Sequence, residues 1–403
     1  MLHSNICDER KIPHLSTYGL ALFLFLTPFE YPLADLMSVS PLRLVGLAAM
    51  GLAVLDIIHR KRITVDYRSL CIVIWLVYGF VSLLWAIDEA RFSSYYSIYM
   101  NNSLMFLLFA TISFTRSEVE TLKKSMVFGV GALLLYMTFI PDAVSYSDYQ
   151  HRLTLNAGTE GLDQNYLAAL MLMSFGIVFY DLCNKQLLKK HKILSVVFCA
   201  TVAYYVFLTG SRSGLIAIIL IVLLSINTSY KNRFVIGLPI LVLLLFVFPL
   251  LSKYVSQDLL ERFSLSALTG QEEESAARLL IWEKALTALG GIEVIFGYGT
   301  GASQTVIGNT IGGGKDMAIH NHYLAMLVEY GIAGSLMINI PILKMVTALW
   351  KKDKGMSVGF IGILLMAFFL DVVTTKFFWS AMILLSICHS ATKTHKTCVS
   401  NCD

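Results

Sequence analysis

Long apolar runs alternate with short polar segments along almost the whole chain, and one polar stretch, near residues 251–319, is far longer than the others. About twenty apolar residues make a helix long enough to cross the hydrocarbon core of a bilayer. Runs that reach or approach this length are centred near residues 22, 50, 77, 106, 131, 173, 200, 220, 241, 333, 364 and 383. The pattern therefore predicts an all-α polytopic membrane protein with about twelve transmembrane helices.

The composition agrees with this prediction, since 56% of the 403 residues are hydrophobic and only 14% are charged. A soluble globular domain carries a larger charged fraction, so that class of protein is excluded. The net charge of +4 is too small to indicate a nucleic-acid partner.

The distribution of Lys and Arg predicts how the helices are oriented. With a cytoplasmic amino terminus, the inward-facing segments hold most of the 31 Lys and Arg, as the positive-inside rule requires. Both termini are then cytoplasmic and the long polar loop faces outward. The seven cysteines fall in helices or on the inward side, so no disulfide framework is predicted.

Four regions follow from this topology. Residues 1–250 hold the first nine transmembrane helices, 251–319 form the outward loop, 320–391 hold the last three helices, and 392–403 are a cytoplasmic tail. The loop contains the one candidate for structure outside the membrane.

Within the loop, residues 276–289 predict a short amphipathic helix. Leu279, Trp282 and Leu286 recur at spacings of three and four, and two glycines close the segment. We expect this helix to lie along the membrane surface. The glycine-rich segments 297–301 and 312–314 predict a mobile, turn-rich stretch that could admit a bulky substrate.

Arg212 is the first candidate for chemistry. It lies in a Thr-Gly-Ser-Arg-Ser-Gly segment at 209–214, between two apolar runs on the outward side, where Ser211 and Ser213 are placed to cap the following helix. A guanidinium beside a helix N-terminus favours phosphate, because unpaired N–H groups and the helix dipole act together there. An arginine that extends to the lipid headgroups is the alternative interpretation.

Arg278 is the second candidate and lies on the predicted surface helix, one turn before Trp282. It could hold a phosphate group. The competing interpretation is an ordinary salt bridge to Glu274, four residues earlier, or to Glu283.

His320 is the third candidate, because it is predicted to open the helix that re-enters the membrane from outside. The positive helix end favours a neutral imidazole, which can accept a proton. Asn321 could hold the ring or an acceptor by hydrogen bonds, and His322 lies about 200° further round the helix. A structural histidine at the interface is the alternative.

Two further groups of polar residues offer weaker candidates. Asp163 is placed to cap a helix that starts from outside, and Gln164 or Asn165 could line a polar cavity there. Glu30 and Asp35, in the first outward loop, suggest a metal-dependent membrane glycosyltransferase as an alternative.

Two acidic residues interrupt or flank apolar runs near the carboxyl end of the chain. Because charge in a membrane segment is costly, Glu329 and Asp371 are minor functional candidates.

In its motifs the chain resembles the superfamily of O-antigen ligases and polymerases of the bacterial inner membrane. The matching segments are LTGSRSG at 208–214, RLLIW at 278–282 followed by FGYG at 296–299, and HNHYL at 320–324 followed by EYGIAG at 329–334. Their order, the long loop before the last motif and the predicted helix number all fit. The motifs cover roughly residues 160 to 340.

The resemblance implies transfer of a polymerised glycan from undecaprenyl diphosphate to the lipid A–core oligosaccharide at the periplasmic face. It implies an inverting transfer without metal, cofactor or nucleotide, with a lipid-linked donor, a lipid A–core acceptor and membrane lipids as partners. By the same resemblance, Arg212 and Arg278 would hold the diphosphate, and His320 would deprotonate the acceptor hydroxyl.

The single dominant outward loop favours a ligase, since polymerases of this superfamily tend to have two sizeable loops. An O-antigen polymerase is the near alternative. A lipid or sugar transporter is a third interpretation, disfavoured because most charges lie at the ends of the apolar runs rather than deep within them.

Overall fold

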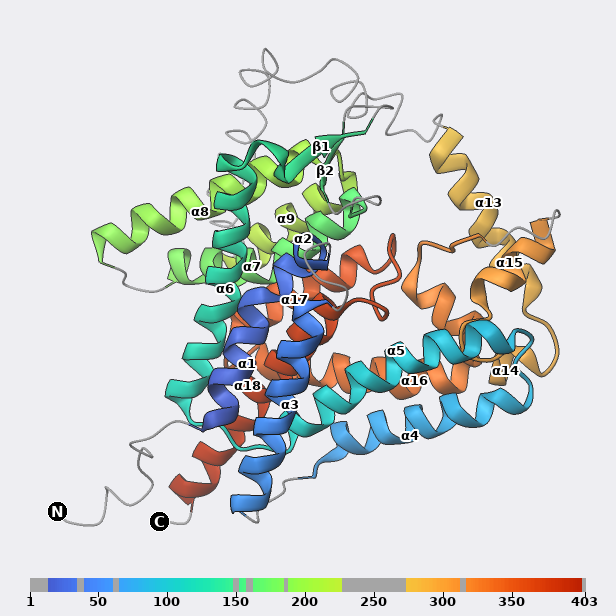
Figure 1. The fold of residues 1–403 in the computed structure, drawn as a ribbon, viewed down its shortest axis with the longest axis horizontal. Coiled ribbons are helices and arrows are strands. Elements are labelled where there is room, and N and C mark those ends of the chain that lie inside the picture. Colours follow the sequence, from blue (N-terminus) through green and yellow to red (C-terminus); the bar gives the residue numbers. More distant parts are fainter. Residues whose placement is uncertain are drawn as a thin grey trace.

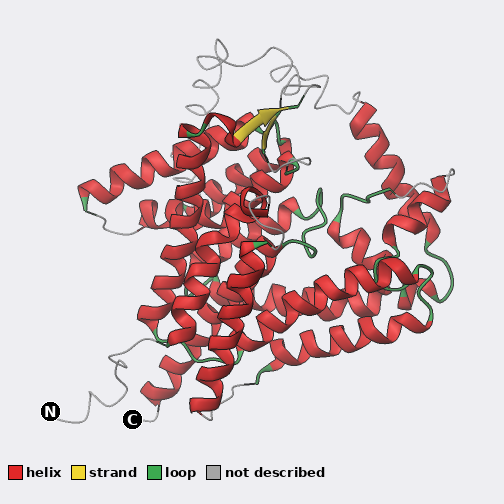
Figure 2. Ribbon diagram, in the orientation of Figure 1, coloured by secondary structure: helices red, strands yellow, loops and turns green. Residues whose placement is uncertain are grey.

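The structure is a computed structural model that describes residues 14–34, 40–60, 65–147, 152–156, 162–184, 188–226, 273–311 and 317–400. Helices dominate these residues, with one two-stranded antiparallel hairpin (Figures 1 and 2). The helices are α1 (Leu15–Leu26), α2 (Glu30–Ala34), α3 (Pro41–Arg60), α4 (Tyr67–Val81), α5 (Glu89–Ala110), α6 (Arg116–Phe139), α7 (Gln164–Asn184), α8 (Lys189–Leu208), α9 (Arg212–Ser225), α13 (Glu273–Ala288), α14 (Glu293–Phe296), α15 (Ser303–Ile311), α16 (His322–Leu349), α17 (Lys354–Met366) and α18 (Lys376–Ser400).

Short elements join or extend these helices at the ends predicted to face outward. They are the 3-10 turns η1 (Thr27–Phe29), η2 (Ser82–Leu84) and η3 (Pro141–Ala143), and the strands β1 (Val144–Tyr146) and β2 (Leu153–Leu155). The hairpin pairs Val144 with Leu155 and links α6 to α7.

The predicted helical architecture is confirmed, whereas the number of twelve spans is not shown. Each predicted helix centre lies in a described helix except the one near residue 241, which falls outside the described residues. In the described part of the chain, six helices are long and apolar enough to cross a membrane, and α9, α17 and the apolar part of α18 are shorter. The first predicted span is one that is too short, because η1 ends α1 after 12 residues.

Two loop predictions can be compared with the described helices. The helix expected at 276–289 is α13. The helix α18 continues as far as Ser400, so most of the predicted tail at 392–403 is helical, and its cytoplasmic location stays a prediction.

Polar side chains at the borders of the apolar runs begin the helices. Asp66, Asp88 and Asp353 accept hydrogen bonds from backbone N–H groups in the first turns of α4, α5 and α17. Thr115 and Glu118 form a capping box at the start of α6. Because such caps satisfy donors that the helix itself leaves unpaired, they set where each helix starts.

Long-range contacts keep the helix ends in two groups. At the ends predicted to face inward, the Lys123 ammonium group of α6 pairs with Asp353 at 2.9 Å. Arg68 of α4 donates to the Ser386 carbonyl oxygen of α18 at 2.6 Å. At the predicted outward ends, Lys376 of α18 pairs with Glu30 of α2. This grouping is what alternating helices require, and the assignment of the groups to the two sides of a membrane rests on charge.

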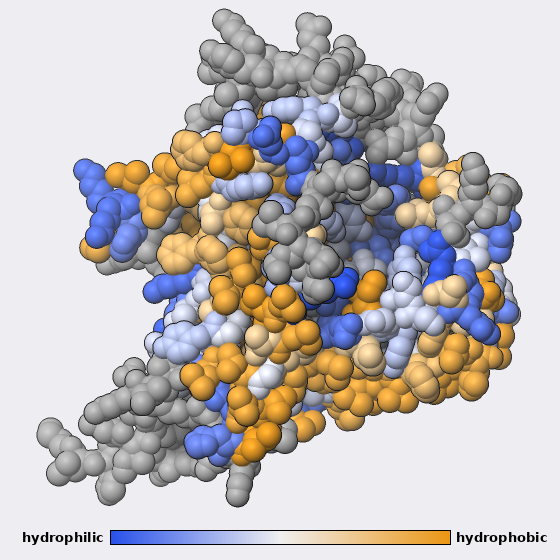
Figure 3. Space-filling model, in the orientation of Figure 1, coloured by the Kyte–Doolittle hydropathy of each residue, from blue (hydrophilic) through white to orange (hydrophobic). Residues whose placement is uncertain are grey.

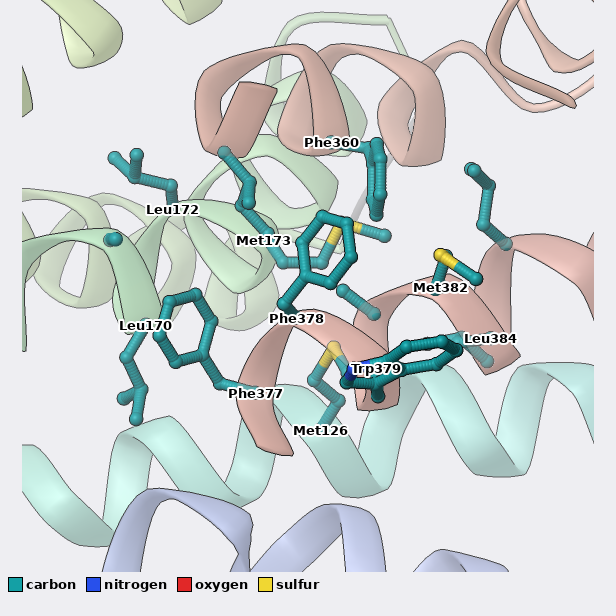
Figure 4. Close-up of a cluster of buried hydrophobic side chains, with 14 of the residues drawn as sticks. Met126, Leu170, Leu172, Met173, Phe360, Phe377, Phe378, Trp379, Met382 and Leu384 are labelled. Carbon is teal, nitrogen blue, oxygen red and sulfur yellow. The ribbon is translucent and has the colours of Figure 1, made fainter. Parts of the chain in front are cut away.

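The core lies where α7, α17 and the first half of α18 meet α6. Phe360, Phe378 and Trp379 pack there with Met126 and Met173 (Figure 4). Among the long-range contacts, α7 and α17 approach each other closely, because a Cβ at Gly176 would lie 2.4 Å from the Cα of Gly359. Small residues at such a crossing let two helix backbones touch, as is typical of membrane helices.

The expectation of a mobile stretch at 297–301 is wrong, because its glycines are closely packed: Gly297 against α16, Gly299 against the segment after α4, and Gly301 against α5. Gly297 has φ 73°, and a Cβ there would lie 2.3 Å from the Glu329 carbonyl oxygen. Gly331 breaks α16 with φ 60°, and its Cβ would lie 2.2 Å from the Ile295 carbonyl oxygen. The two glycines therefore form a reciprocal backbone contact, called here the glycine clasp. The other glycine-rich segment, 312–314, lies outside the described residues.

We expect Gly297→Ala or Gly331→Ala to destabilise the protein strongly. Each substitution adds the cost of a left-handed residue, about 1–2 kcal/mol, to a direct overlap with backbone that cannot move aside. Thermal unfolding in detergent measures the effect. Gly290→Ala is the matched control, since a Cβ at Gly290 meets nothing within 4 Å. Equal melting temperatures for the clasp variants and this control would contradict the prediction.

Candidate active site

Arg212 lies in the first turn of α9, in a backbone arrangement that the 209–214 segment determines. Gly210, at φ 62°, follows the end of α8 and reverses the chain, which only glycine does at little cost. Ser211 then caps α9 by accepting a hydrogen bond from Gly214 N–H at 3.2 Å. The predicted capping role of Ser211 is confirmed, and Arg212 occupies the positive end of a helix.

Arg152, which the sequence analysis did not single out, holds this turn in place. Its side chain is 7% exposed, and its Nε donates to the Thr209 carbonyl oxygen at 2.9 Å. A second nitrogen of the guanidinium donates to the Asn165 side-chain oxygen at 3.3 Å. The hairpin that ends at β2 thus fixes both the Arg212 turn and the start of α7.

The start of α7 agrees with its sequence interpretation. The Asp163 carboxylate accepts the Asn165 N–H at 2.8 Å, which makes it the predicted cap. Asn165 is buried against Arg152, and Gln164 is partly exposed beside it. Nearby, Tyr31, Tyr166 and Phe377 line a small crevice between the outer ends of α2, α7 and α18.

His320 lies just before α16 rather than inside it. The helix begins at His322, and Asn321 is its N-cap, accepting the Leu324 N–H at 3.1 Å. The prediction that His320 opens the helix is therefore wrong, because the helix starts two residues later. The 200° separation between His320 and His322, which assumed that both lie in the helix, does not apply. The Asn321 amide oxygen is used in this cap, so it stabilises the helix start.

The backbone of His320 is unusual, with φ 51°. Among the described residues no other non-glycine residue has a positive φ. A left-handed conformation costs a residue with a side chain about 1–2 kcal/mol, and such strain is concentrated at functional sites. The imidazole is partly exposed at the positive end of α16.

The helix that carries Arg278 is attached to the residue before His320. Trp282 of α13 donates its indole N–H to the Ile319 carbonyl oxygen at 3.1 Å. Ile281 and Ala285 are the buried face of α13, whereas Leu279 is 61% exposed. The predicted apolar stripe thus does not face the protein along its whole length. Arg278 is partly exposed, one turn before the Trp282 anchor.

The turn between α17 and α18, residues 367–375, connects the Arg212 side of the site to the His320 side. His322 N–H donates to the Ala367 and Leu370 carbonyl oxygens at 2.8 and 2.9 Å. Tyr166, next to Asn165, donates its hydroxyl to the Asp371 carbonyl oxygen at 3.0 Å. In Figure 1 this turn lies between α9 and α13.

His322 and Asp371 lie side by side within this junction. The His322 side chain is 1% exposed and that of Asp371 22%, and His322 Nδ1 lies 3.8 Å from an Asp371 carboxylate oxygen. Among the residues that the structure describes, neither ring nitrogen of His322 has a hydrogen-bond partner, nor has that carboxylate oxygen. The ring packs against Phe378 of the core. The prediction of a supporting role for His322 is in keeping with this burial and stays a prediction.

Glu329, the other acidic candidate, is fully buried in the outer part of α16. Its carboxylate accepts hydrogen bonds from Ser303 of α15 at 2.7 Å and from Tyr99 of α5 at 3.3 Å. Its backbone carbonyl accepts the Gly299 N–H at 2.9 Å. Glu329 thus holds the loop helices onto α16 beside the glycine clasp, which is a structural role.

The remaining acidic alternative concerns Glu30 and Asp35. Glu30 pairs with Lys376, so its charge is already compensated by a neighbouring helix. Asp35 lies outside the described residues.

At the start of α5, a hydrogen bond from the Arg91 N–H holds the pKa of Asp88 below its usual range. Asp88 also accepts a hydrogen bond from the Thr305 hydroxyl of α15 at 2.9 Å.

A comparison with protein-family models matches residues 196–338 to a family described as O-antigen ligase. The match begins within α8, includes the Arg212 turn and α13, and ends in α16 beyond His320. The chain carries an O-antigen ligase domain. The match covers about a third of the chain, and over that part the chain is similar to membrane glycosyltransferases that act on lipid-linked glycans. A comparison with curated proteins gives no match.

The sequence motifs of the O-antigen ligase domain identified the turns, but not the residues that fix them. Arg152 and the 367–375 turn lie outside the matched range. The sequence offered one signal, a charged residue near an apolar run, which Asp371 provides and which Arg152 provides in a loop.

We expect Trp282→Phe to lower turnover by the O-antigen ligase domain roughly tenfold. Phenylalanine keeps the ring but loses the N–H that holds Ile319, and a misplacement of about 1 Å at a catalytic group can cost a factor of about 100. Turnover of purified protein measures the effect. Trp350→Phe is the control, because Trp350 lies at the opposite end of α16, beside Lys354. Unchanged turnover in Trp282→Phe would show that this anchor does not position His320.

Proposed function

We propose that the chain is an O-antigen ligase, which transfers polymerised O-antigen from undecaprenyl diphosphate to the lipid A–core oligosaccharide at the periplasmic face. The observation that carries the proposal is the arrangement around the 367–375 turn. It links two cationic helix regions, those of Arg212 and Arg278, to a strained histidine.

The donor's diphosphate is the natural ligand of the Arg212 region. It carries negative charge, and the first turn of α9 offers a guanidinium and a positive helix end together. The Arg152 contacts keep that turn rigid, so it needs little reorganisation when the anion binds. Arg278, on α13, would share the charge of the diphosphate.

His320 would act as the general base. Its neutral imidazole takes the proton from the acceptor hydroxyl, and the hydroxyl oxygen attacks the anomeric carbon of the donor. A carbon–oxygen bond forms there with inversion, while the bond to the diphosphate oxygen breaks and its electron pair leaves with the diphosphate. The two arginines stabilise that leaving charge, so the reaction needs no separate general acid.

The size of the outward segments supports the ligase over the polymerase. Between α6 and α7, the described residues form only η3 and the short hairpin that holds Arg152. That segment supports the Arg212 turn. Among the described residues, the α13–α15 region is then the one large structure on the side predicted to face outward.

We expect His320→Ala to abolish glycan transfer by purified protein that is still folded, because the base is lost. Arg212→Lys and Arg278→Lys should each lower turnover about a hundredfold, since an ammonium group cannot replace a bidentate fork. Thermal unfolding confirms that each variant is folded.

His191→Ala and Arg116→Lys are the matched controls. His191 is an exposed histidine on α8. Arg116, like Arg212, is the first residue of its helix, but it lies among the helix ends predicted to face inward. Both controls should retain full activity. Full activity in His320→Ala would remove His320 from the mechanism, and wild-type turnover in Arg278→Lys would favour the salt-bridge interpretation.

A deletion strain distinguishes the ligase from the polymerase. Loss of a ligase leaves long glycan on undecaprenyl diphosphate and bare lipid A–core. A strain whose core instead carries a single repeat unit would identify the chain as a polymerase.

A further inference from the structure

Three apolar side chains of the loop region point away from the protein. Ile292, Ile295 and Phe296, at the start and end of α14, are 65%, 50% and 41% exposed. We call them the α14 ridge. They lie in the outward region, where polar side chains would meet water at no cost, so their exposure needs an explanation.

The α14 ridge continues the exposed apolar faces of two membrane helices. Exposed side chains recur at helical spacing along both helices: Val73, Val77, Phe80 and Leu84 on α4 and η2, and Ile332, Leu336, Ile340 and Leu343 on α16. If the two helices cross a bilayer, these exposed apolar faces contact lipid. Figure 3 shows apolar surface running along the α4 and α5 side of the molecule.

Direct contacts join the α14 ridge to both faces. The rings of Phe296 and Trp85 pack edge to face at 6.4 Å, and Tyr78 donates its hydroxyl to the Phe296 carbonyl oxygen at 2.9 Å. On the other side, Ile295 lies against Gly331, directly before the exposed Ile332. The ridge is therefore the outer end of a surface shared with α4 and α16.

The lengths of the helices place the α14 ridge at the boundary of the bilayer. The apolar span from Tyr67 to Leu84 has 18 residues. At 1.5 Å per residue it reaches roughly 27 Å, close to the hydrocarbon thickness of about 30 Å. The part of α16 beyond the Gly331 break, residues 332–349, has the same length. Both helices thus reach the outer boundary where α14 packs against them.

The chemistry around the α14 ridge is that of a membrane interface. Trp85, which directly follows the apolar span, is an aromatic residue with a polar atom, the type that gathers at the headgroup level, and Tyr78 lies less than two turns deeper. Immediately beyond them the chain turns polar at Asp88 and Glu89. The apolar side chains of the ridge, the aromatic side chains and then the acidic side chains follow one another in the order found at a bilayer surface.

We propose that the α14 ridge is inserted into the outer leaflet of the membrane, so that lipid acyl chains and headgroups cover Ile292, Ile295 and Phe296. Because the glycine clasp fixes α14 against α16, the depth at which α14 enters the membrane also fixes the depth of α16. Because α16 begins two residues after His320, this contact sets the height of the histidine above the bilayer. The proposal concerns membrane seating and stands independently of the chemistry assigned to His320.

Photo-crosslinking in lipid nanodiscs tests the proposal. The photoreactive residue p-benzoylphenylalanine replaces Ile292 or Ile295 in the full chain, and mass spectrometry identifies the adducts after irradiation. Leu84, 84% exposed on the lipid face, is the positive control, and Asn309, an exposed polar residue of α15, is the negative control.

The proposal expects phospholipid adducts at Ile292 and Ile295 in a yield comparable with Leu84 and well above Asn309. Crosslinks to a second copy of the chain would overturn it and make the α14 ridge a subunit interface. Absence of lipid adducts at both positions, with adducts at Leu84, would overturn it by placing the ridge in water.

Discussion

The short turn between α17 and α18 is the constraint on which the site depends. Its backbone carbonyls accept hydrogen bonds from His322 on one side and from Tyr166 on the other. Phe369 of the same turn packs against Trp282 at 6.2 Å between ring centroids, and Trp282 holds Ile319. Because α17 and α18 also form the centre of the core, the turn is a rigid support that positions the outward elements relative to one another.

The fold uses two kinds of interaction to hold polar groups at the edge of the apolar core. Backbone carbonyls at turns accept side-chain donors, as Thr209 does from Arg152. Close backbone contacts at glycines, of which the clasp is one, attach the loop helices to α16 without any side chain. Strain is then left at His320, whose conformation must be supported by its neighbours on both sides. This distribution suits a site that binds a charged group beside lipid.

The sequence predicted the helical class and most helix positions, because apolar periodicity and turn signals are local, whereas the roles of Arg212, Arg278 and His320 stay predictions. It could not predict the role of Arg152, since the Thr209 carbonyl that it meets is 57 residues away. It placed His320 inside α16 because an Asn N-cap and a helix start one residue earlier look alike in a single sequence. It also took the glycines at 297–301 as signs of mobility, whereas glycine equally permits the closest packing, and only the position of α16 distinguishes these outcomes.

The proposed mechanism requires Arg212 and Arg278 to bind one anion together, with His320 beside it. A cryo-electron microscopy structure of the chain in a nanodisc with a lipid-linked diphosphate donor would show whether they do. We expect the diphosphate within hydrogen-bond distance of both guanidinium groups and the anomeric carbon facing His320. A diphosphate bound elsewhere, or contacting only one of the arginines while the other faces bulk solvent, would contradict it.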